Sequence, residues 1–405
     1  MKISKVKNLI GPVLLFVSTV NLAHENPFDT DDSSSVYRQN IEESDHEDIS
    51  IVADELDISH DEVINALDFQ SDFKLLFEEI ITTYPEKISR VWVEPIPGQE
   101  AYIQFVDEVP LIETHLNVDM FGGGIYSTQE QDERAYQLTE LLVSYEYENF
   151  MTYFDHSSGL IVLKILAESV DEAMTLADLE SILEAAEMSN PLSIEEIDYS
   201  VLEGSGEIYE LHHSRGGEQL LQGKRFRCTS GFAVNGPSGG GIVTAGHCSP
   251  VLNKFKQSPN LIYSMKLRAF VDRRGDAAYY TTTHIEPAEY WATPRKIRKV
   301  TGSRWTIFMW HGMRVCQYGR ASNKRNCSHK MISSNTNFGL KYGLIRTNMA
   351  QVSNISTTNG DSGGPWSWST EAWGITSGIS RGANSNFFTP VEIYEKQLNV
   401  TTKTK

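Results

Sequence analysis

The spacing of apolar residues differs between the two halves of the chain. In the first half, apolar residues recur with helical periodicity over residues 63–77, 135–147 and 171–186. Strand-like runs cover residues 91–106, interrupted by a Pro-Ile-Pro-Gly turn, and residues 160–165. Ser169 and Glu172 have the spacing of a capping box at the third helix. This order of helices and strands predicts an α/β domain.

The second half shows a different pattern, which is typical of an all-β protein. Short apolar runs at residues 232–234, 242–244, 277–283, 306–310 and 372–375 are separated by clusters of Gly, Ser and Asn. Only residues 390–398 have helical spacing. Many short strands joined by turns favour a barrel or a sandwich.

The first 60 residues have neither pattern. Residues 1–23 have the features of a secretory signal peptide, with Lys2, Lys5 and Lys7 before an apolar run and a small residue, Ala23, near its end. Residues 24–60 are rich in Asp, Glu and Ser, and this composition predicts disorder. No later run is apolar enough to span a membrane, so we expect a secreted, extracellular protein without a membrane partner.

Charge separates the two halves further. Residues 1–213 contain 9 Lys and Arg against 45 Asp and Glu, whereas residues 214–405 contain 26 against 9. Opposite fields of this size predict that the acidic half docks on the basic half in cis. The basic run at residues 294–299 could in principle meet nucleic acid, but a solvated face or the docking site is the favoured interpretation, so no nucleic-acid partner is expected.

The stretch Asn-Gly-Asp-Ser-Gly-Gly-Pro at residues 359–365 carries the candidate chemistry. Its glycines allow backbone angles that other residues resist, so it predicts a tight loop around Ser362. Such a loop can direct backbone N–H groups to one point beside the hydroxyl, where they would stabilise an oxyanion. Because a hydroxyl alone is a weak nucleophile, Ser362 needs a base and a group that orients the base.

Residues 244–248, Thr-Ala-Gly-His-Cys, end an apolar strand at the candidate base, His247. Together with the serine loop, this segment resembles the chymotrypsin-fold serine proteases, and its flanks resemble the bacterial streptogrisin and alpha-lytic protease branch. Supporting matches are Cys-Thr-Ser-Gly-Phe-Ala-Val at 228–234, Val-Cys-Gln-Tyr-Gly-Arg at 315–320 and Gly-Ile-Thr-Ser-Gly at 374–378. The resemblance covers residues 214–405.

The resemblance implies an all-β catalytic domain of two six-stranded barrels at residues 214–405. It also implies that residues 61–213 are a smaller α/β pro-region that assists folding and inhibits the protease until it is cut off. The chain would then be the zymogen of a monomeric serine endopeptidase acting on proteins or peptides, cut near residues 211–214. The linker composition at residues 203–206 offers an alternative cutting place.

The third catalytic residue follows by elimination among few candidates. Residues 214–405 contain only Asp272, Asp276 and Asp361, and Asp361 adjoins the nucleophile. Asp276 directly precedes small residues that enter an apolar run, which favours it over Asp272 as a buried carboxylate, and it resembles the Asp-x-Ala pattern of the family. The resemblance assigns the oxyanion hole to the N–H groups of Gly360 and Ser362.

All four cysteines lie in the second half: Cys228, Cys248, Cys316 and Cys327. Four cysteines allow three pairings, and the resemblance implies the two local pairs, Cys228 with Cys248 and Cys316 with Cys327. A zinc site is disfavoured because no Cys-x-x-Cys pair exists and because export implies an oxidising compartment. The histidines of the first half are scattered without metal-ligand spacing, so we expect neither a metal nor another cofactor.

The substrate site is readable only by resemblance, which assigns Ser377, Gly378, Ile379 and Ser356 to it. Trypsin-like members have an acid six residues before the nucleophile, where this chain has Ser356, so a preference for Arg or Lys is disfavoured. Ile379 stands where glycine is common and favours small or medium apolar side chains.

The sequence departs from the family next to the nucleophile. Gln317 replaces the arginine that pairs with the aspartate before the nucleophile, so Asp361 is expected to find another partner, such as Arg314, Arg320 or a new N-terminus.

Two other functions fit parts of the sequence. The Gly-x-Ser-x-Gly pattern also fits α/β-hydrolases, but these need a histidine after the serine, and the last histidine is His329. The remaining alternative is a catalytically silent relative acting as a secreted binding or adhesion protein.

Overall fold

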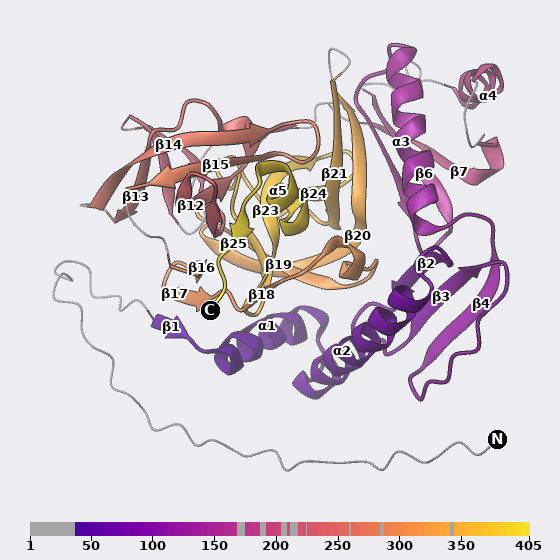
Figure 1. Cartoon of the computed structure of the whole chain (residues 1–405), viewed down its shortest axis with the longest axis horizontal. Coiled ribbons are helices and arrows are strands. Elements are labelled where there is room, and N and C mark those ends of the chain that lie inside the picture. The colour runs from indigo at the N-terminus through magenta and orange to yellow at the C-terminus, as the bar shows by residue number, and fades with distance from the viewer. Residues whose placement is uncertain are drawn as a thin grey trace. The chain divides into compact units, whose positions relative to one another are not determined.

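The computed structural model describes residues 37–167, 175–186, 192–203, 209–210, 218–223, 225–258, 261–283, 287–340 and 344–405. These residues belong to one compact unit, Val36–Lys405. We call residues 37–203 the N-terminal region and residues 218–405 the C-terminal domain (Figure 1). The signal peptide and the cutting places expected from the sequence, at residues 1–23, 204–206 and 211–214, lie outside the described residues.

Capping boxes fix the starts of the helices in the N-terminal region. In each box, the side chain of a Ser, Thr or Asn accepts a hydrogen bond from the backbone N–H of the residue three positions later. The acidic side chain of that later residue accepts a hydrogen bond from the backbone N–H of the Ser, Thr or Asn. The helices are α1 (Ile41–Leu56), α2 (His60–Thr83), α3 (Thr128–Ser144) and α4 (Leu176–Ala185). The capping box predicted at Ser169 lies outside the described residues, and α4 starts at Leu176 with Thr175 as its N-cap.

The expectation of disorder for residues 24–60 is wrong for the part that the structure describes. Residues 41–56 form α1, and Asp48, Val52 and Ala53 on this helix are buried. Composition misled here because Glu47, Asp48 and Glu55 of α1 pair with basic side chains of the C-terminal domain. Val52 and Ala53 also join an apolar cluster that contains the Cys316–Cys327 disulfide.

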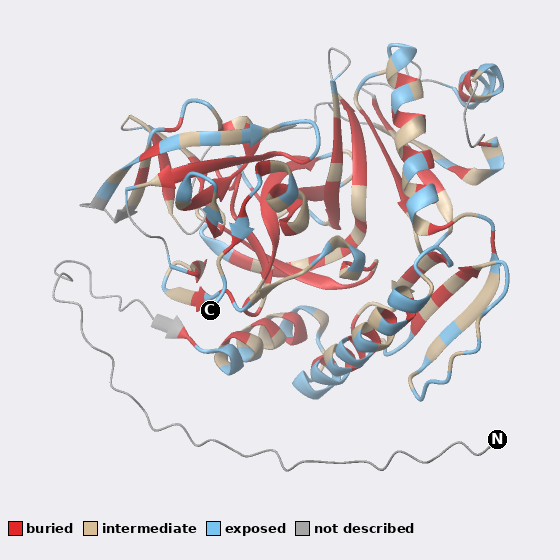
Figure 2. Cartoon of the chain, viewed as in Figure 1, coloured by how far each residue is buried: buried red, intermediate tan, exposed pale blue. Residues whose placement is uncertain are grey.

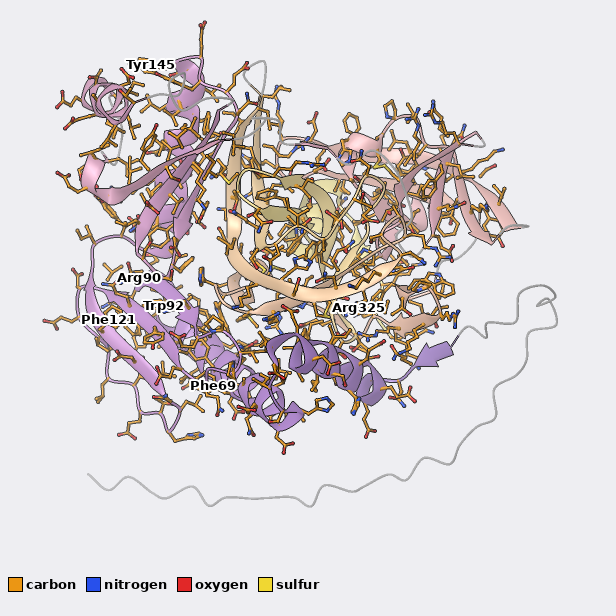
Figure 3. The ribbon with its side chains drawn as sticks, turned by 180° about the vertical axis from the view of Figure 1, so that it is seen from behind. Phe69, Arg90, Trp92, Phe121, Tyr145 and Arg325 are labelled. Atoms are coloured by element: carbon orange, nitrogen blue, oxygen red, sulfur yellow. A yellow bond between two sulfur atoms is a disulfide. The ribbon has the colours of Figure 1, made fainter. Side chains whose placement is uncertain are left out.

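Seven strands complete the described part of the N-terminal region. Its strands are β1 (Tyr37–Gln39), β2 (Ile88–Val93), β3 (Ala101–Val106), β4 (Val118–Gly124), β5 (Phe150–Asp155), β6 (Leu160–Ala167) and β7 (Ile197–Glu203). Strands β2, β3 and β4 form one sheet, on which Arg90 lies 4.9 Å over Trp92 and 5.8 Å over Phe121 (Figure 3). Helices α3 and α4 share an apolar core with β5, β6 and β7. The predicted α/β domain is confirmed.

The first half of the C-terminal domain is a sheet of eight strands, in the order β10-β9-β13-β14-β15-β12-β11-β25. The strands are β9 (Gln219–Gln222), β10 (Arg225–Thr229), β11 (Ala233–Gly236), β12 (Gly239–Thr244), β13 (Lys254–Ser258), β14 (Leu261–Val271), β15 (Ala277–Thr282) and β25 (Thr401–Thr402). The last helix, α5 (Val391–Leu398), packs against this sheet through Val391, Tyr394 and Leu398.

The second half is a closed barrel of six strands. They follow the order β19-β22-β23-β24-β21-β20, and pairing of β19 with β20 closes the ring. The strands are β19 (Arg314–Gly319), β20 (Lys324–Leu340), β21 (Leu344–Ser353), β22 (Pro365–Trp368), β23 (Glu371–Ser380) and β24 (Ser385–Pro390). The connection between the two sheets contains β16 (Glu289–Thr293), β17 (Lys296–Lys299) and β18 (Gly302–Ser303). The all-β, chymotrypsin-like architecture expected for this half is confirmed, with most of its strands buried (Figure 2). The second sheet is the expected six-stranded barrel, whereas the first sheet has eight strands instead of six.

The N-terminal region and the C-terminal domain share both a sheet and a core. The long strand β20 pairs with β5, with Phe338 opposite Met151, so the barrel sheet continues into β5, β6 and β7. Phe73 of α2 packs 4.7 Å from Trp310 of the domain, measured between ring centroids. Among the described residues, no helix is long and apolar enough to cross a membrane.

Candidate active site

His247 lies where strand β12 ends in the 3-10 helix η3 (Gly246–Cys248). Two constraints hold this short helix. The neighbouring Cys248 is disulfide-bonded to Cys228 of β10, and the His247 backbone N–H donates to Asp276 Oδ1 at 2.8 Å. The imidazole therefore projects from a segment that is anchored on both sides.

Asp276 stands directly before β15, as the sequence analysis expected, and is fully buried. Its Oδ2 lies 2.6 Å from His247 Nδ1 and also accepts the Ser377 hydroxyl. Burial alone would raise the pKa of Asp276, but the nearby charges of His247 and Arg346 and the hydrogen bonds from His247 and Ser377 lower it well below its usual range. Asp276 is thus an anion. Asp272, the alternative candidate, accepts Arg346 Nε through its backbone carbonyl, and no contact of its side chain with His247 occurs among the described residues.

Ser362 completes the arrangement from the other barrel. Its Oγ lies 2.9 Å from His247 Nε2. The loop around it depends on Gly360 and Gly363, whose φ angles are +121° and +84°. A Cβ at Gly363 would stand 2.2 Å from Thr244 Oγ1, next to the strand that leads to His247. Only glycine lets the two loops approach this closely.

Asp361 is held by backbone amides rather than by an arginine. Its Oδ1 accepts the N–H groups of Ala321 and Ser322 at 2.9 and 3.1 Å, and its Oδ2 accepts that of Thr358 at 2.9 Å. Burial raises the pKa of Asp361, and these hydrogen bonds oppose the rise. The prediction that Arg314 or Arg320 pairs with Asp361 is therefore wrong within the described part of the chain.

The two arginines proposed as partners of Asp361 have other contacts. Arg314 pairs with Glu55 of α1 at 3.0 Å, and Arg320 donates to the Tyr318 hydroxyl at 3.1 Å. The side-chain amide of Gln317 is buried and, within the described part of the chain, makes no hydrogen bond. Gln317 therefore does not take over the role that the family gives to arginine.

The residues expected to bind substrate lie along β23 and beside it. Ser377, Gly378 and Ile379 are buried in β23, and the two-residue strand β8 (Tyr209–Glu210) pairs antiparallel with Gly378 and Ile379. The chain's own backbone thus already occupies the edge of this segment.

Ser356 lies in the segment between β21 and β22, and its Oγ is 2.6 Å from His329 Nε2. His329 is fully buried, and its Nδ1 lies 2.8 Å from the Ser353 carbonyl. Burial lowers the pKa of His329 to about 4, so the ring is neutral near pH 7. The sequence does not predict the buried position of His329 beside Ser356. A polar residue among the apolar positions of a strand was the available signal.

The cysteines are disulfide-bonded in the local pairs expected from the family, Cys228 with Cys248 and Cys316 with Cys327. Two groups of possible metal ligands occur among the described residues, and both contain the sulfurs of one of these disulfides, which are not free thiolates. Neither group has the donors of a zinc site.

Known proteins similar to this chain are proteases. Residues 276–398 match the Trypsin family. Streptogrisin-A from Streptomyces griseus is 27% identical over 249 residues, which are 59% of this chain and 73% of that protein. Among solved structures, the Nocardiopsis protease NAPase is 26% identical and covers 47% of this chain and 98% of its own, with a TM-score of 0.39. Thermobifida fusca protease A is 25% identical, with coverages of 47% and 98% and a TM-score of 0.37.

Proposed function

Because this chain contains a serine protease domain of the trypsin family, we propose that it is a secreted serine endopeptidase made as a zymogen, with Ser362, His247 and Asp276 as its catalytic triad. One observation carries the assignment of the triad. The hydroxyl, imidazole and carboxylate form a continuous chain, with 2.9 Å between Ser362 Oγ and His247 Nε2 and 2.6 Å between His247 Nδ1 and Asp276 Oδ2.

The proposed reaction follows from these contacts. Ser362 Oγ attacks the scissile carbonyl while His247 Nε2 takes its proton, and His247 then gives that proton to the leaving amine. Asp276, held as an anion, keeps Nδ1 protonated and stabilises the imidazolium. The N–H groups of Gly360 and Ser362 would stabilise the oxyanion. Water, activated by His247, then hydrolyses the acyl-enzyme on Ser362.

We further propose that residues 61–213 are an inhibitory pro-region acting in cis, followed by the protease at residues 214–405. The support is the pairing of β8 with Gly378 and Ile379, since by resemblance this segment binds the substrate backbone. A substrate strand and β8 cannot pair with the same edge at once. Cutting near residues 211–214 would release β8 from the mature chain. The pocket beside Ser356 and Ile379 is expected to take small or medium apolar side chains rather than Arg or Lys.

The test compares the wild-type chain with Ser362→Ala after export from the producing cell. Intact mass and N-terminal sequencing should show a wild-type product of about 190 residues, whereas Ser362→Ala should stay joined to its acidic half. Equal processing of both would show that another protease does the cutting. In that case a fluorophosphonate probe decides: failure to label Ser362 would refute the catalytic proposal and favour the silent binding protein.

A further inference from the structure

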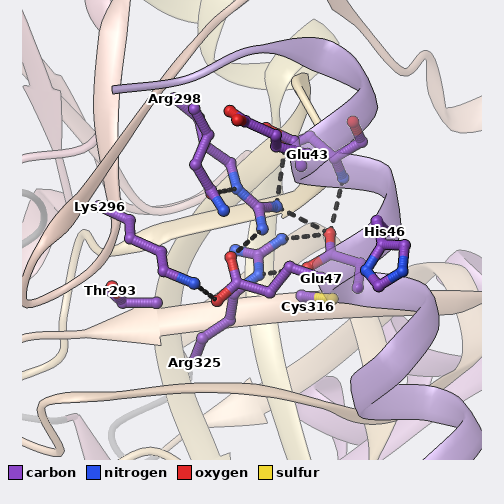
Figure 4. Close-up of polar contacts among 12 residues, drawn as sticks. Glu43, His46, Glu47, Thr293, Lys296, Arg298, Cys316 and Arg325 are labelled. Carbon is purple, nitrogen blue, oxygen red and sulfur yellow. Dashed lines mark hydrogen bonds and ion pairs between the residues drawn. The ribbon is translucent and has the colours of Figure 1, made fainter. Parts of the chain in front are cut away.

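Helix α1 covers two buried arginines that come from separate parts of the C-terminal domain. Arg298 lies on β17, between the two sheets, and Arg325 lies on β20 of the closed barrel. Their side chains are 0% and 2% exposed. Figure 4 shows the two guanidinium groups close together beside α1. Two like charges at such a place need a shared counterion.

Asp48 of α1 is that counterion. Its Oδ1 accepts Arg325 Nε at 2.7 Å. Its Oδ2 accepts a second nitrogen of Arg325 at 2.7 Å, Arg298 Nη1 at 2.9 Å and the backbone N–H of Ser369 at 2.8 Å. Asp48 is fully buried. Burial alone would raise the pKa of its carboxyl group, but the charges of Arg325 and Arg298 lower it. The carboxylate is charged and bound by donors on both oxygens.

The residues around Asp48 strengthen the same contact. Glu47 binds Arg298 at 2.6 Å and Lys296 at 2.7 Å, and the Gln39 side chain accepts Arg298 Nε at 2.8 Å. The short strand β1 pairs in parallel with β17. One segment, residues 37–56, therefore binds this face of the domain through a strand and a helix.

This contact is separate from the candidate active site. The domain residues that bind Asp48 lie on β17, on β20 and in the turn between β22 and β23. Among the described residues, Asp48 and Glu47 contact neither the proposed triad nor the two β23 residues that pair with β8. Binding at one place does not require binding at the other.

We propose that Arg298, Arg325 and the Ser369 amide form a carboxylate-binding site on the C-terminal domain. Its ligand is the acidic segment 37–56, and it holds the N-terminal region on the domain independently of the pairing between β8 and β23. This proposal rests on the proposed function only for the cut between the N-terminal region and the C-terminal domain. The carboxylate-binding site itself does not depend on catalysis. Because Asp48 is shielded from solvent, this contact resists salt better than an exposed ion pair does.

The test uses the full chain with Ser362→Ala and a recognition sequence for a different, site-specific protease inserted at residues 211–214, so that β8 stays on the N-terminal fragment. After that protease has cut the chain, the Kd between the two fragments is measured by dilution and size-exclusion chromatography. Asp48→Asn should raise the Kd by roughly 30-fold or more, because it leaves two buried arginines without their counterion. The matched control is Asp54→Asn, which removes one negative charge from an exposed position of the same helix and should leave the Kd unchanged.

A competitor tests the independence of the two contacts. A synthetic peptide of residues 206–213, added in excess, occupies the edge of β23. The two fragments also share the pairing of β5 with β20 and the core around Phe73 and Trp310. If the two contacts are independent, the peptide should therefore raise the Kd by the same factor in the wild type and in Asp48→Asn. Equal Kd values for Asp48→Asn and Asp54→Asn, or a peptide effect that differs between the wild type and Asp48→Asn, would overturn the proposal.

If Asp48→Asn does not accumulate as folded protein, the Kd of Glu47→Gln tests the proposal instead. It removes the partly exposed partner of Arg298 and Lys296 and keeps Asp48 in place, so the Kd should rise several-fold. An unchanged Kd would refute the proposal. Because every variant carries Ser362→Ala and is cut by an added protease, these results stand whether or not the chain cuts itself.

Discussion

The substitution Gly319→Ala should strongly lower the activity of the protease, although it changes no residue of the proposed triad. The backbone φ of Gly319 is not positive, so alanine can adopt its conformation. However, a Cβ at this position would stand 2.0 Å from Asp361 Cγ and 2.1 Å from its Oδ1. Asp361 directly precedes Ser362, so the clash falls on the residue that anchors the nucleophile loop.

The size of the effect follows from these distances. To restore an ordinary contact of 3.4 Å from 2.0 Å, the carboxylate must move by about 1.4 Å. That movement breaks the bonds from the N–H groups of Ala321, Ser322 and Thr358, each worth about 1.5–3 kcal/mol because the acceptor is charged. A displacement of about 1 Å at a reacting group costs on the order of 100-fold in rate.

We therefore expect Gly319→Ala to lower kcat/KM by about 100-fold, equivalent to about 2.7 kcal/mol of transition-state stabilisation. The assay is hydrolysis of a chromogenic peptide by the matured enzyme, with active-site titration and thermal melting alongside. Gly302→Ala is the matched control, because a Cβ at Gly302 meets nothing within 4 Å. Activity of Gly319→Ala within threefold of the control would refute the role given to Asp361.

Three further predictions concern other buried polar groups. Asp276→Asn should lower kcat about 10⁴-fold with little change in thermal stability, because the amide cannot hold the required tautomer of His247; a loss below tenfold would contradict this. Gln317→Leu should raise the free energy of unfolding by about 1 kcal/mol or more in urea titrations, since its amide is buried without a partner among the described residues; a loss of stability would show that the amide is bonded. Asp132 lines a cavity of about 670 Å³ between the N-terminal region and the C-terminal domain, and burial raises its pKa to about 7 against a hydrogen bond to Asn335. A carboxyl group whose pKa is raised in the folded state stabilises the fold at low pH, and this contribution is lost as the pH rises from about 4 through 7. Asp132→Asn should therefore bring the unfolding free energies at pH 5 and pH 8 closer together. An unchanged difference between the two pH values would contradict the raised pKa of Asp132.

The site was predictable from the sequence because its chemistry depends on local motifs. The glycines around Ser362 and the strand ending at His247 are legible from a few neighbouring residues, and Asp276 had only one serious competitor. The helix starts were predictable in principle for the same reason, since a capping box involves residues three apart.

The environment of Asp361 and the order in residues 37–56 could not be predicted, because both depend on distant contacts. Asp361 is held by backbone amides of a loop about 40 residues away, and amides leave no mark in a sequence. Helix α1 is kept in place by a pair of arginines and by an apolar cluster around Val52 and Ala53, and both sets of partners come together only in the folded chain. The pairing of β5 with β20 likewise has no local signature.

The carboxylate-binding site for Asp48 also determines when, during synthesis, helix α1 can bind the C-terminal domain with all its contacts. Its donors include Arg325 and the Ser369 amide, which lie 277 and 321 residues further along the chain. At about 5–20 residues per second, a ribosome needs roughly 16–64 s to make those 321 residues. Until the end of this interval Asp48 lacks at least one of its partners. Helix α1 is therefore made long before it can be fully secured, which leaves the acidic segment accessible to export and folding factors until Ser369 has been made.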